Sequence, residues 1–182
     1  MERSCNLGPE RQARQGKTTA PMASDPARLI RQLELQPHPE GGWYRELHRS
    51  AVGVVRQDDG QPRAGLTLIA FLLQAGESSR WHRVRQADEL WYHGGGAPLD
   101  LLRLPPQGGS TEHLRLGRLD AADPQQQPVQ LIPADWWQAA RSMGDWSLSY
   151  CSVGPGFDFA DFNLLADLPL AERPDGADPA LI

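Results

Sequence analysis

A histidine and a glutamate in the middle of the chain have the clearest capacity for chemistry. They stand in a spaced pattern: Gly76, five residues, His82, one residue, Val84, four residues, Glu89, six residues and Gly96. An imidazole can act as a general base near neutral pH, and a neighbouring carboxylate can orient it. The same two groups are ligands that iron, manganese, zinc and nickel accept. The spacing therefore predicts a proton-transfer site or, alternatively, a metal site.

Aromatic and polar residues extend this candidate site along the same strand and onto a later segment. Alternate residues of a strand share a face, so Glu89, Trp91 and His93 are expected to point the same way. Tryptophan can stack on a sugar or a base, but large aromatic side chains also serve simply as core. We predict four ligand-binding residues here, with core packing or exposure at the rim as the open alternatives: Trp91, His93, Trp137 and Gln138.

A turn rich in proline and glycine, Pro37–Gly42, supplies the last two candidates, His38 and Glu40. We predict both as ligand-binding residues. The alternative is that this segment matters only for its backbone, because glycine adopts positive φ without strain. Two further histidines, His48 and His113, fall on predicted outer strands, and we assign them no role.

Composition narrows the class of protein. The chain has 182 residues, which favours one domain with a real core, and its formal charge of −5 argues against nucleic-acid binding. The only lysine is Lys17, in a polar N-terminal stretch, so Schiff-base and phosphate-loop lysine chemistry are excluded. Cys5 and Cys151 have no zinc-like spacing, and a disulfide between them is not expected. A reducing compartment fits this pattern.

The sequence also indicates where the protein acts. Its longest apolar run, Leu66–Leu73, is much shorter than the roughly 20 residues of a membrane-spanning helix. The N-terminal stretch carries scattered charges and no apolar central region, so it does not resemble a secretory signal. We therefore expect a cytoplasmic protein with no membrane partner.

Three segments are expected along the chain. Residues 1–21 lack apolar periodicity and are predicted to be a disordered extension, with Met22 as an alternative start. Residues 22–168 form the single domain, which opens with a short helix capped by Ser24 or Asp25 and carrying Pro26 in its first turn. Residues 169–182, rich in proline, aspartate and alanine, are predicted to be a flexible tail.

The domain itself reads as a series of short strands. Glycine and proline clusters separate most of them, which is typical of an all-β sandwich or barrel. The predicted strands are Trp43–Arg49, Leu66–Leu73, Arg80–Arg85, Glu89–His93, Leu99–Leu104, Glu112–Leu116, Val129–Ile132 and Ser147–Val153.

Four motifs occur in one order along the chain: Pro37–Glu46, Asp88–Trp91, Pro133–Ala139 and Pro155–Phe159. Together they closely resemble a cupin family known as domain of unknown function 985, or cupin 5, and the resemblance covers 29–165. It implies a double-stranded β-helix, which is a jelly-roll barrel with a pocket at one mouth, here with a short N-terminal helix. It also implies a homodimer that binds a small-molecule ligand.

The resemblance also shows what is missing. The spacing around His82 is that of the first cupin signature, in which Val84 stands where a second metal-binding histidine is usual. In the second signature only Pro133 matches, and Gln138 stands where the third histidine is usual. No cofactor is certain; a divalent metal, if present, would be held weakly by His82, Glu89 and Gln138, because a neutral amide is a poor ligand for a transition metal.

We therefore predict a small-molecule-binding cupin and, as the leading hypothesis, an enzyme of isomerase or epimerase type that acts on a polar, carbohydrate-type metabolite. His82 would be the general base, and Glu89 would orient it. Two alternatives stay open: a non-catalytic ligand-binding or sensor cupin, and a metal-dependent cupin enzyme, which Val84 and Gln138 disfavour.

Overall fold

The computed structural model describes residues 25–182, so the predicted disordered extension 1–21 lies outside the described residues. The first element is the helix α1 (Pro26–Gln32), and the side chain of Asp25 caps it by accepting a hydrogen bond from the Ala27 backbone N–H at 3.0 Å. Leu29, Ile30 and Leu33 pack against a buried cluster of four apolar residues: Leu35, Ala70, Leu72 and Leu148. The predicted short N-terminal helix is confirmed.

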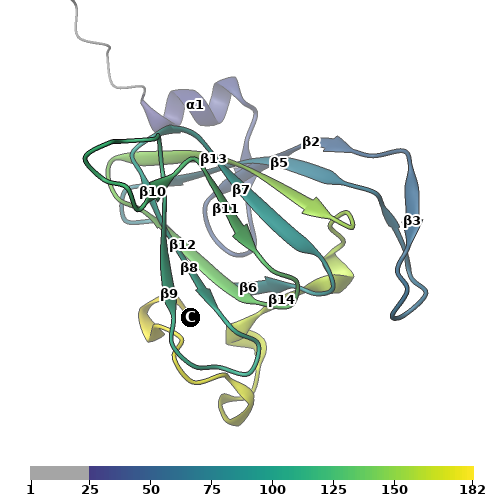
Figure 1. Cartoon of the computed structure of the whole chain (residues 1–182). Coiled ribbons are helices and arrows are strands. Elements are labelled where there is room, and N and C mark those ends of the chain that lie inside the picture. The colour runs from purple at the N-terminus through teal and green to yellow at the C-terminus, as the bar shows by residue number, and fades with distance from the viewer. Residues whose placement is uncertain (1–24) are drawn as a thin grey trace, which may run out of the picture.

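Two six-stranded sheets make up most of the domain, as Figure 1 shows. The first contains, in spatial order, β1 (Gln36–Pro37), β2 (Trp43–Arg49), β5 (Thr67–Gln74), β13 (Trp146–Gly154), β7 (Asp88–Gly96) and β11 (Val129–Ile132). The second contains β10 (Gln126–Gln127), β9 (Glu112–Leu116), β8 (Leu99–Leu104), β12 (Trp137–Ser142), β6 (Ser78–Val84) and β14 (Phe162–Leu164). From β5 to β8 and again from β10 to β14, sequential strands alternate between the sheets, and the predicted all-β jelly roll is confirmed.

The main core lies between these two sheets. It joins Phe71 and Cys151 of the first sheet to Leu101 and Ala140 of the second, all fully buried. Burial of this apolar surface is the main force that holds the sheets together. Because alternate strand residues point inward, the same arrangement directs any polar residue of the inner faces into the barrel.

One central strand, β12, was not predicted. It lies between β6 and β8, and its first four residues, Trp137 to Ala140, are all buried. A strand covered on both faces has no alternation of polar and apolar residues, and this one also lacks the β-branched residues that usually mark strands. Pattern reading therefore missed the strand that carries Gln138.

The C-terminal segment corrects another prediction. One short 3₁₀ turn, η1 (Phe159–Asp161), precedes β14, and three follow it: η2 (Leu165–Asp167), η3 (Leu170–Glu172) and η4 (Pro179–Leu181). Leu181 is 4 % exposed and packs in one cluster with Trp81 and Leu165. The indole N–H of Trp81 donates to the Asp178 carbonyl at 3.1 Å. The prediction of a flexible tail over 169–182 was wrong, because a few apolar side chains suffice to dock this segment.

A small two-stranded sheet, β3 (Gly53–Val55) and β4 (Pro62–Ala64), projects from the ends of β2 and β5 (Figure 1). Two arginines of this arm, Arg56 and Arg63, reach back to Asp161 at 2.9 and 2.7 Å. Within residues 25–182, no helix is long and apolar enough to cross a membrane.

Candidate active site

The turn between β1 and β2 packs tightly on the start of β6. Gly41 has a φ of 111°, and a Cβ atom there would lie 2.2 Å from the Ser78 carbonyl oxygen, so only glycine fits. The backbone N–H of Arg80 donates to the Glu40 carbonyl at 2.8 Å. The glycine thereby brings the neighbouring Glu40 against β6. The backbone explanation of this turn agrees with the structure, and the turn also places His38 and Glu40 beside His82; their role in ligand binding stays a prediction.

Glu40 is the centre of a buried polar network and is only 5 % exposed. Ser79 Oγ–H donates to its Oε1 at 2.8 Å. Its Oε2 lies 3.2 Å from His38 Nδ1 and 3.2 Å from His82 Nε2. One carboxyl group is thus contacted by a hydroxyl and by two imidazoles.

The contacts of His82 show how this network is protonated. Its Nδ1 lies 2.8 Å from the Arg80 carbonyl oxygen, which only accepts, so Nδ1 carries a proton. Burial lowers the pKa of His82, and Glu40 opposes this effect. Burial alone would raise the pKa of Glu40, but His82, His38 and Ser79 lower it. We conclude that Glu40 is the ionised group of the network and that both nitrogens of His82 are engaged within the protein, Nδ1 by the Arg80 carbonyl and Nε2 by the Glu40 carboxyl group.

A cavity of about 120 Å³ opens beside this network. Its polar lining includes His38, Glu89 and Cys151, and its apolar lining comes from Tyr44, Ile69, Val153, Phe157 and Phe159. His38 belongs to both the network and the cavity. Its Nδ1 contacts Glu40, and among residues 25–182 nothing forms a hydrogen bond with its Nε2. His38 is therefore the imidazole with a nitrogen available to a ligand.

Glu89, at the start of β7, has quite different surroundings. Gln138 Nε2 donates to Glu89 Oε2 at 2.6 Å, and the Trp91 indole N–H donates to Gln138 Oε1 at 3.0 Å. Burial raises the pKa of Glu89 to about 8; the Gln138 hydrogen bond counteracts this only in part, and the charge of Glu40 adds to it. Glu89 is consequently uncharged at neutral pH.

The predicted pairing of Glu89 with His82 was wrong. Glu40 contacts His82, and Glu89 forms its hydrogen bond with Gln138 from the facing sheet. The reason is topological: the tight turn at Gly41 brings a carboxylate from outside the spaced pattern nearer to His82 than the pattern's own glutamate.

Comparisons with known proteins agree with this architecture. The profile of the family Cupin superfamily (DUF985) matches residues 27–165, most of the chain. The chain belongs to this family. The predicted resemblance is confirmed, whereas no curated protein sequence matches.

Solved structures place this cupin among similar folds. A protein from Shewanella oneidensis is 37 % identical, with a TM-score of 0.66, over 75 % of this chain and 82 % of that chain. A hypothetical protein from Leishmania major is 29 % identical, with a TM-score of 0.67, over 75 % and 85 % of the respective chains. A Bacillus subtilis oxalate decarboxylase is 15 % identical, with a TM-score of 0.51 over 74 % of this chain and 32 % of that chain, which shows likeness of fold alone.

The donor set of this cupin does not fit a metal ion. Within residues 25–182, no three histidine, cysteine, aspartate or glutamate side chains are grouped so that they could hold one. Val84 offers no donor atom and packs against Ala87 and Val153. Gln138 turns its amide nitrogen, which cannot ligate, toward Glu89. The metal set considered from the sequence, His82 with Glu89 and Gln138, is therefore not supported by the structure.

The remaining predicted residues separate into two groups. Trp91 lies in the main core, with its ring 5.6 Å from that of Phe71, and acts on the site through Gln138. Trp137 packs in the cluster around Trp81, with the Arg83 guanidinium 4.5 Å above its ring. Neither Trp137 nor the half-buried His93, whose Nε2 has no partner within residues 25–182, is part of the cavity lining. Their predicted roles in ligand binding gain no support from the structure.

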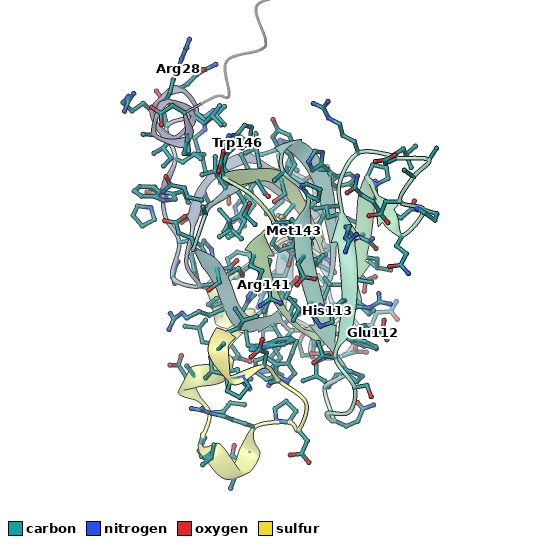
Figure 2. The ribbon with its side chains drawn as sticks, turned by 90° about the vertical axis from the view of Figure 1, so that its left-hand side faces the viewer. Arg28, Glu112, His113, Arg141, Met143 and Trp146 are labelled. Carbon is teal, nitrogen blue, oxygen red and sulfur yellow. The ribbon has the colours of Figure 1, made fainter. Side chains whose placement is uncertain are left out.

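The two histidines that were given no role are exposed. His113 Nδ1 lies 3.0 Å from Asp100 on the outer face of the second sheet, where Figure 2 also shows Arg141. His48 is exposed on β2. Both are suitable control positions for experiments on the cavity.

Sequence reasoning missed several cavity residues. Tyr44 and Cys151 lie on predicted strands but carry no spacing signal. Phe157 and Phe159 belong to the motif Pro155–Phe159, in which we predicted no site residue from the sequence. Only the sheet pairing brings these segments together.

Proposed function

We propose that this cupin is an enzyme that moves a proton within a small, polar, carbohydrate-type metabolite, as isomerases and epimerases do. The observation that carries the proposal is His38, whose ring lies between Glu40 and the cavity. His38 Nδ1 lies nearer to the Glu40 carboxylate, at 3.2 Å, than to the Glu40 backbone N–H, at 3.4 Å, and the carboxylate contact favours the tautomer in which Nε2 is an unprotonated base. His38 thereby takes the role that the sequence had suggested for His82.

The rest of the network supports this base. Ser79 and His82 occupy the other hydrogen-bonding positions of Glu40 and hold its carboxylate in place. His82, buried and engaged at both nitrogens, is a positioning residue in this proposal rather than the group that touches the substrate.

The cavity limits the size of the ligand. An engineered cavity of roughly 150 Å³ in another protein holds benzene, so about 120 Å³ accommodates the reacting end of a sugar-sized molecule. Tyr44, Phe157 and Phe159 offer apolar faces to such a ring. Arg49 stands at the mouth, where it pairs with Glu46 at 2.6 Å.

The family and the cupin fold support a ligand-binding or enzymatic role in general. Oxalate decarboxylase is an enzyme with a similar fold, so the architecture is compatible with catalysis. A non-catalytic binding cupin would use the same cavity and is the principal competitor. The homodimer and the cytoplasmic location stay predictions, the first of which sedimentation at micromolar concentration would test.

The test begins with a thermal-shift screen of nucleotide sugars, free sugars and keto acids. Each compound that binds is then incubated with the protein in D₂O, and deuterium incorporation at carbon is measured. We expect His38→Gln to slow exchange on the order of a hundred- to ten-thousand-fold, whereas His113→Gln, the outer-face control, retains it.

Binding without exchange in the wild type would favour the non-catalytic alternative. Exchange that survives in His38→Gln would show that His38 is not the base.

A further inference from the structure

The orientation of Gln138 is fixed by its neighbour. An indole N–H only donates, so the Gln138 atom that contacts Trp91 at 3.0 Å must be the amide oxygen. The amide nitrogen then faces Glu89, and its N–H donates to Oε2 at 2.6 Å. Oε2 is occupied as an acceptor, which leaves Oε1 as the carboxyl oxygen that can carry a proton.

The groups around Glu89 do not supply a positive charge. Among residues 25–182 it forms no ion pair with arginine, lysine or histidine. Cys151 of β13 lines the same cavity, and Glu40 acts on Glu89 as a like charge. Arg49 of the lining is committed to Glu46, and the His38 imidazole contacts Glu40.

We infer that Glu89 is a neutral carboxylic acid that donates its O–H to an acceptor oxygen of the ligand, in the position where other cupins use a metal ion. The inference rests on the proposed function, which it deepens by naming the substrate class. That class is carbonyl compounds with a hydrogen on the carbon next to the carbonyl group, because an acid and a base that line one cavity suit enolisation.

The proton transfers balance without a further reactant. His38 Nε2 removes the proton from the carbon, the C–H electron pair forms the C=C bond of the enol, and the carbonyl π pair takes the proton of Glu89. Return of a proton from His38 to carbon, and of the hydroxyl proton to Glu89, restores both residues. Proton return to the other face, or to the neighbouring carbon, gives the epimer or the isomer.

The electrostatics agree with this role. Burial is the largest cause that raises the pKa of Glu89 to about 8. Burial also raises the pKa of the Cys151 thiol, so the thiol stays protonated beside it and adds no charge. An acid with a pKa near the working pH transfers a proton most effectively.

Infrared spectroscopy of the free protein tests the acid directly, because a protonated carboxyl group has its own carbonyl stretching band. We expect a band at neutral pH that disappears as the pH rises through about 8. Glu89→Gln should abolish it, and Glu112→Gln, a control at the exposed start of β9 labelled in Figure 2, should leave it unchanged. Absence of a Glu89-dependent band at neutral pH overturns the inference, whatever the result for His38.

Two further measurements complete the test. Calorimetric titration with Zn²⁺ and Mn²⁺ should show no binding at micromolar concentration, and micromolar binding that Glu89→Gln abolishes would contradict the inference. For a compound that exchanges deuterium, Glu89→Gln should slow exchange on the order of a hundredfold or more. Full deuterium exchange in Glu89→Gln would overturn the role of Glu89 as the acid. If exchange is lost in His38→Gln but kept in Glu89→Gln, the proposed base stands and only the inference about Glu89 fails.

Discussion

Glu40 and Glu89 are buried to almost the same extent, 5 % and 6 % exposed, yet their surroundings favour opposite charge states. Glu40 is contacted by two imidazoles and a hydroxyl, which together lower its pKa despite burial. Glu89 has one amide donor, Gln138, and the weak thiol donor of Cys151, which together do not offset burial, and burial raises its pKa to about 8. Hydrogen-bonding partners, rather than depth, decide which carboxyl group is ionised.

This difference gives the site an ionised carboxylate that orients a base and a neutral carboxyl group that can act as an acid. Pairs of titratable groups with divergent pKa values are typical of acid–base sites. The same comparison explains why the donor set suits proton transfer and not a metal ion, since neither carboxyl group is free to ligate.

The largest expected effect is a loss of folding stability when Glu40, the ionised carboxyl group, is replaced by an uncharged residue. Glu40→Gln takes the ionised acceptor away from Ser79, His38 and His82, and each buried donor left without its partner costs about 1–3 kcal/mol. Glu89→Gln, the matched substitution, replaces one neutral group with another and should cost much less. Denaturant unfolding at neutral pH measures both, and equal losses in the two variants would refute the comparison.

The next largest effect is that of Glu89 on the pH dependence of folding stability. The folded protein holds the Glu89 proton up to a pKa of about 8, whereas the unfolded chain releases it near 4.5, so stability should fall as pH rises through this window. Over that range the contribution is on the order of several kcal/mol. Glu89→Gln should flatten the decline and exceed the wild type in stability at alkaline pH. An unchanged slope in this variant would mean that Glu89 is already ionised.

Glu40 should change the pH dependence of folding stability in the opposite direction to Glu89. Its pKa is lowered, so the stability that it contributes is present above the usual glutamate value of 4.5 and is lost as pH falls through the lowered pKa. Acid unfolding monitored by circular dichroism should therefore begin at higher pH in variants that weaken its contacts, such as Ser79→Ala. An acid transition identical to that of the wild type would argue against the network.

The smallest effect concerns the residue that fixes Gln138. Trp91→Phe removes the N–H donor, leaves the Gln138 carbonyl unsatisfied and should cost about 1–3 kcal/mol. Gln138 can then rotate, and loss of its donated bond should raise the pKa of Glu89 further. Trp137→Phe is the control, because the Trp137 indole nitrogen has no hydrogen-bond partner within residues 25–182. The infrared titration that follows Glu89 would detect the shift in one variant and not in the other.

Much of the fold could be predicted because the strand signals are local. The predicted strands Trp43–Arg49, Leu99–Leu104, Glu112–Leu116 and Val129–Ile132 agree with the structure to the residue. The ordered motifs likewise gave the family. The strand β12 and the docked C-terminal segment were missed because their order depends on burial by distant elements, which no local pattern records.

The candidate site was predictable only in part. His38, Glu40, His82, Glu89 and Gln138 were all named from the sequence, but not which of them meet. The pairing of Glu40 with His82 depends on a turn that only glycine allows. The pairing of Glu89 with Gln138 depends on the packing of the first sheet, which carries Glu89, against the second, which carries Gln138. Both are tertiary contacts, and they reverse the roles that sequence spacing suggested for the two carboxyl groups.

Carbon-13 NMR titration of protein labelled at the glutamate carboxyl carbons tests the contrast between Glu40 and Glu89 most directly, with Glu40→Gln and Glu89→Gln used to assign the two resonances. We predict that the Glu40 resonance stays at its ionised position throughout the neutral range, while the Glu89 resonance titrates with a pKa of about 8. If both resonances are already in the ionised position at pH 6, the acid–base division of this site is wrong.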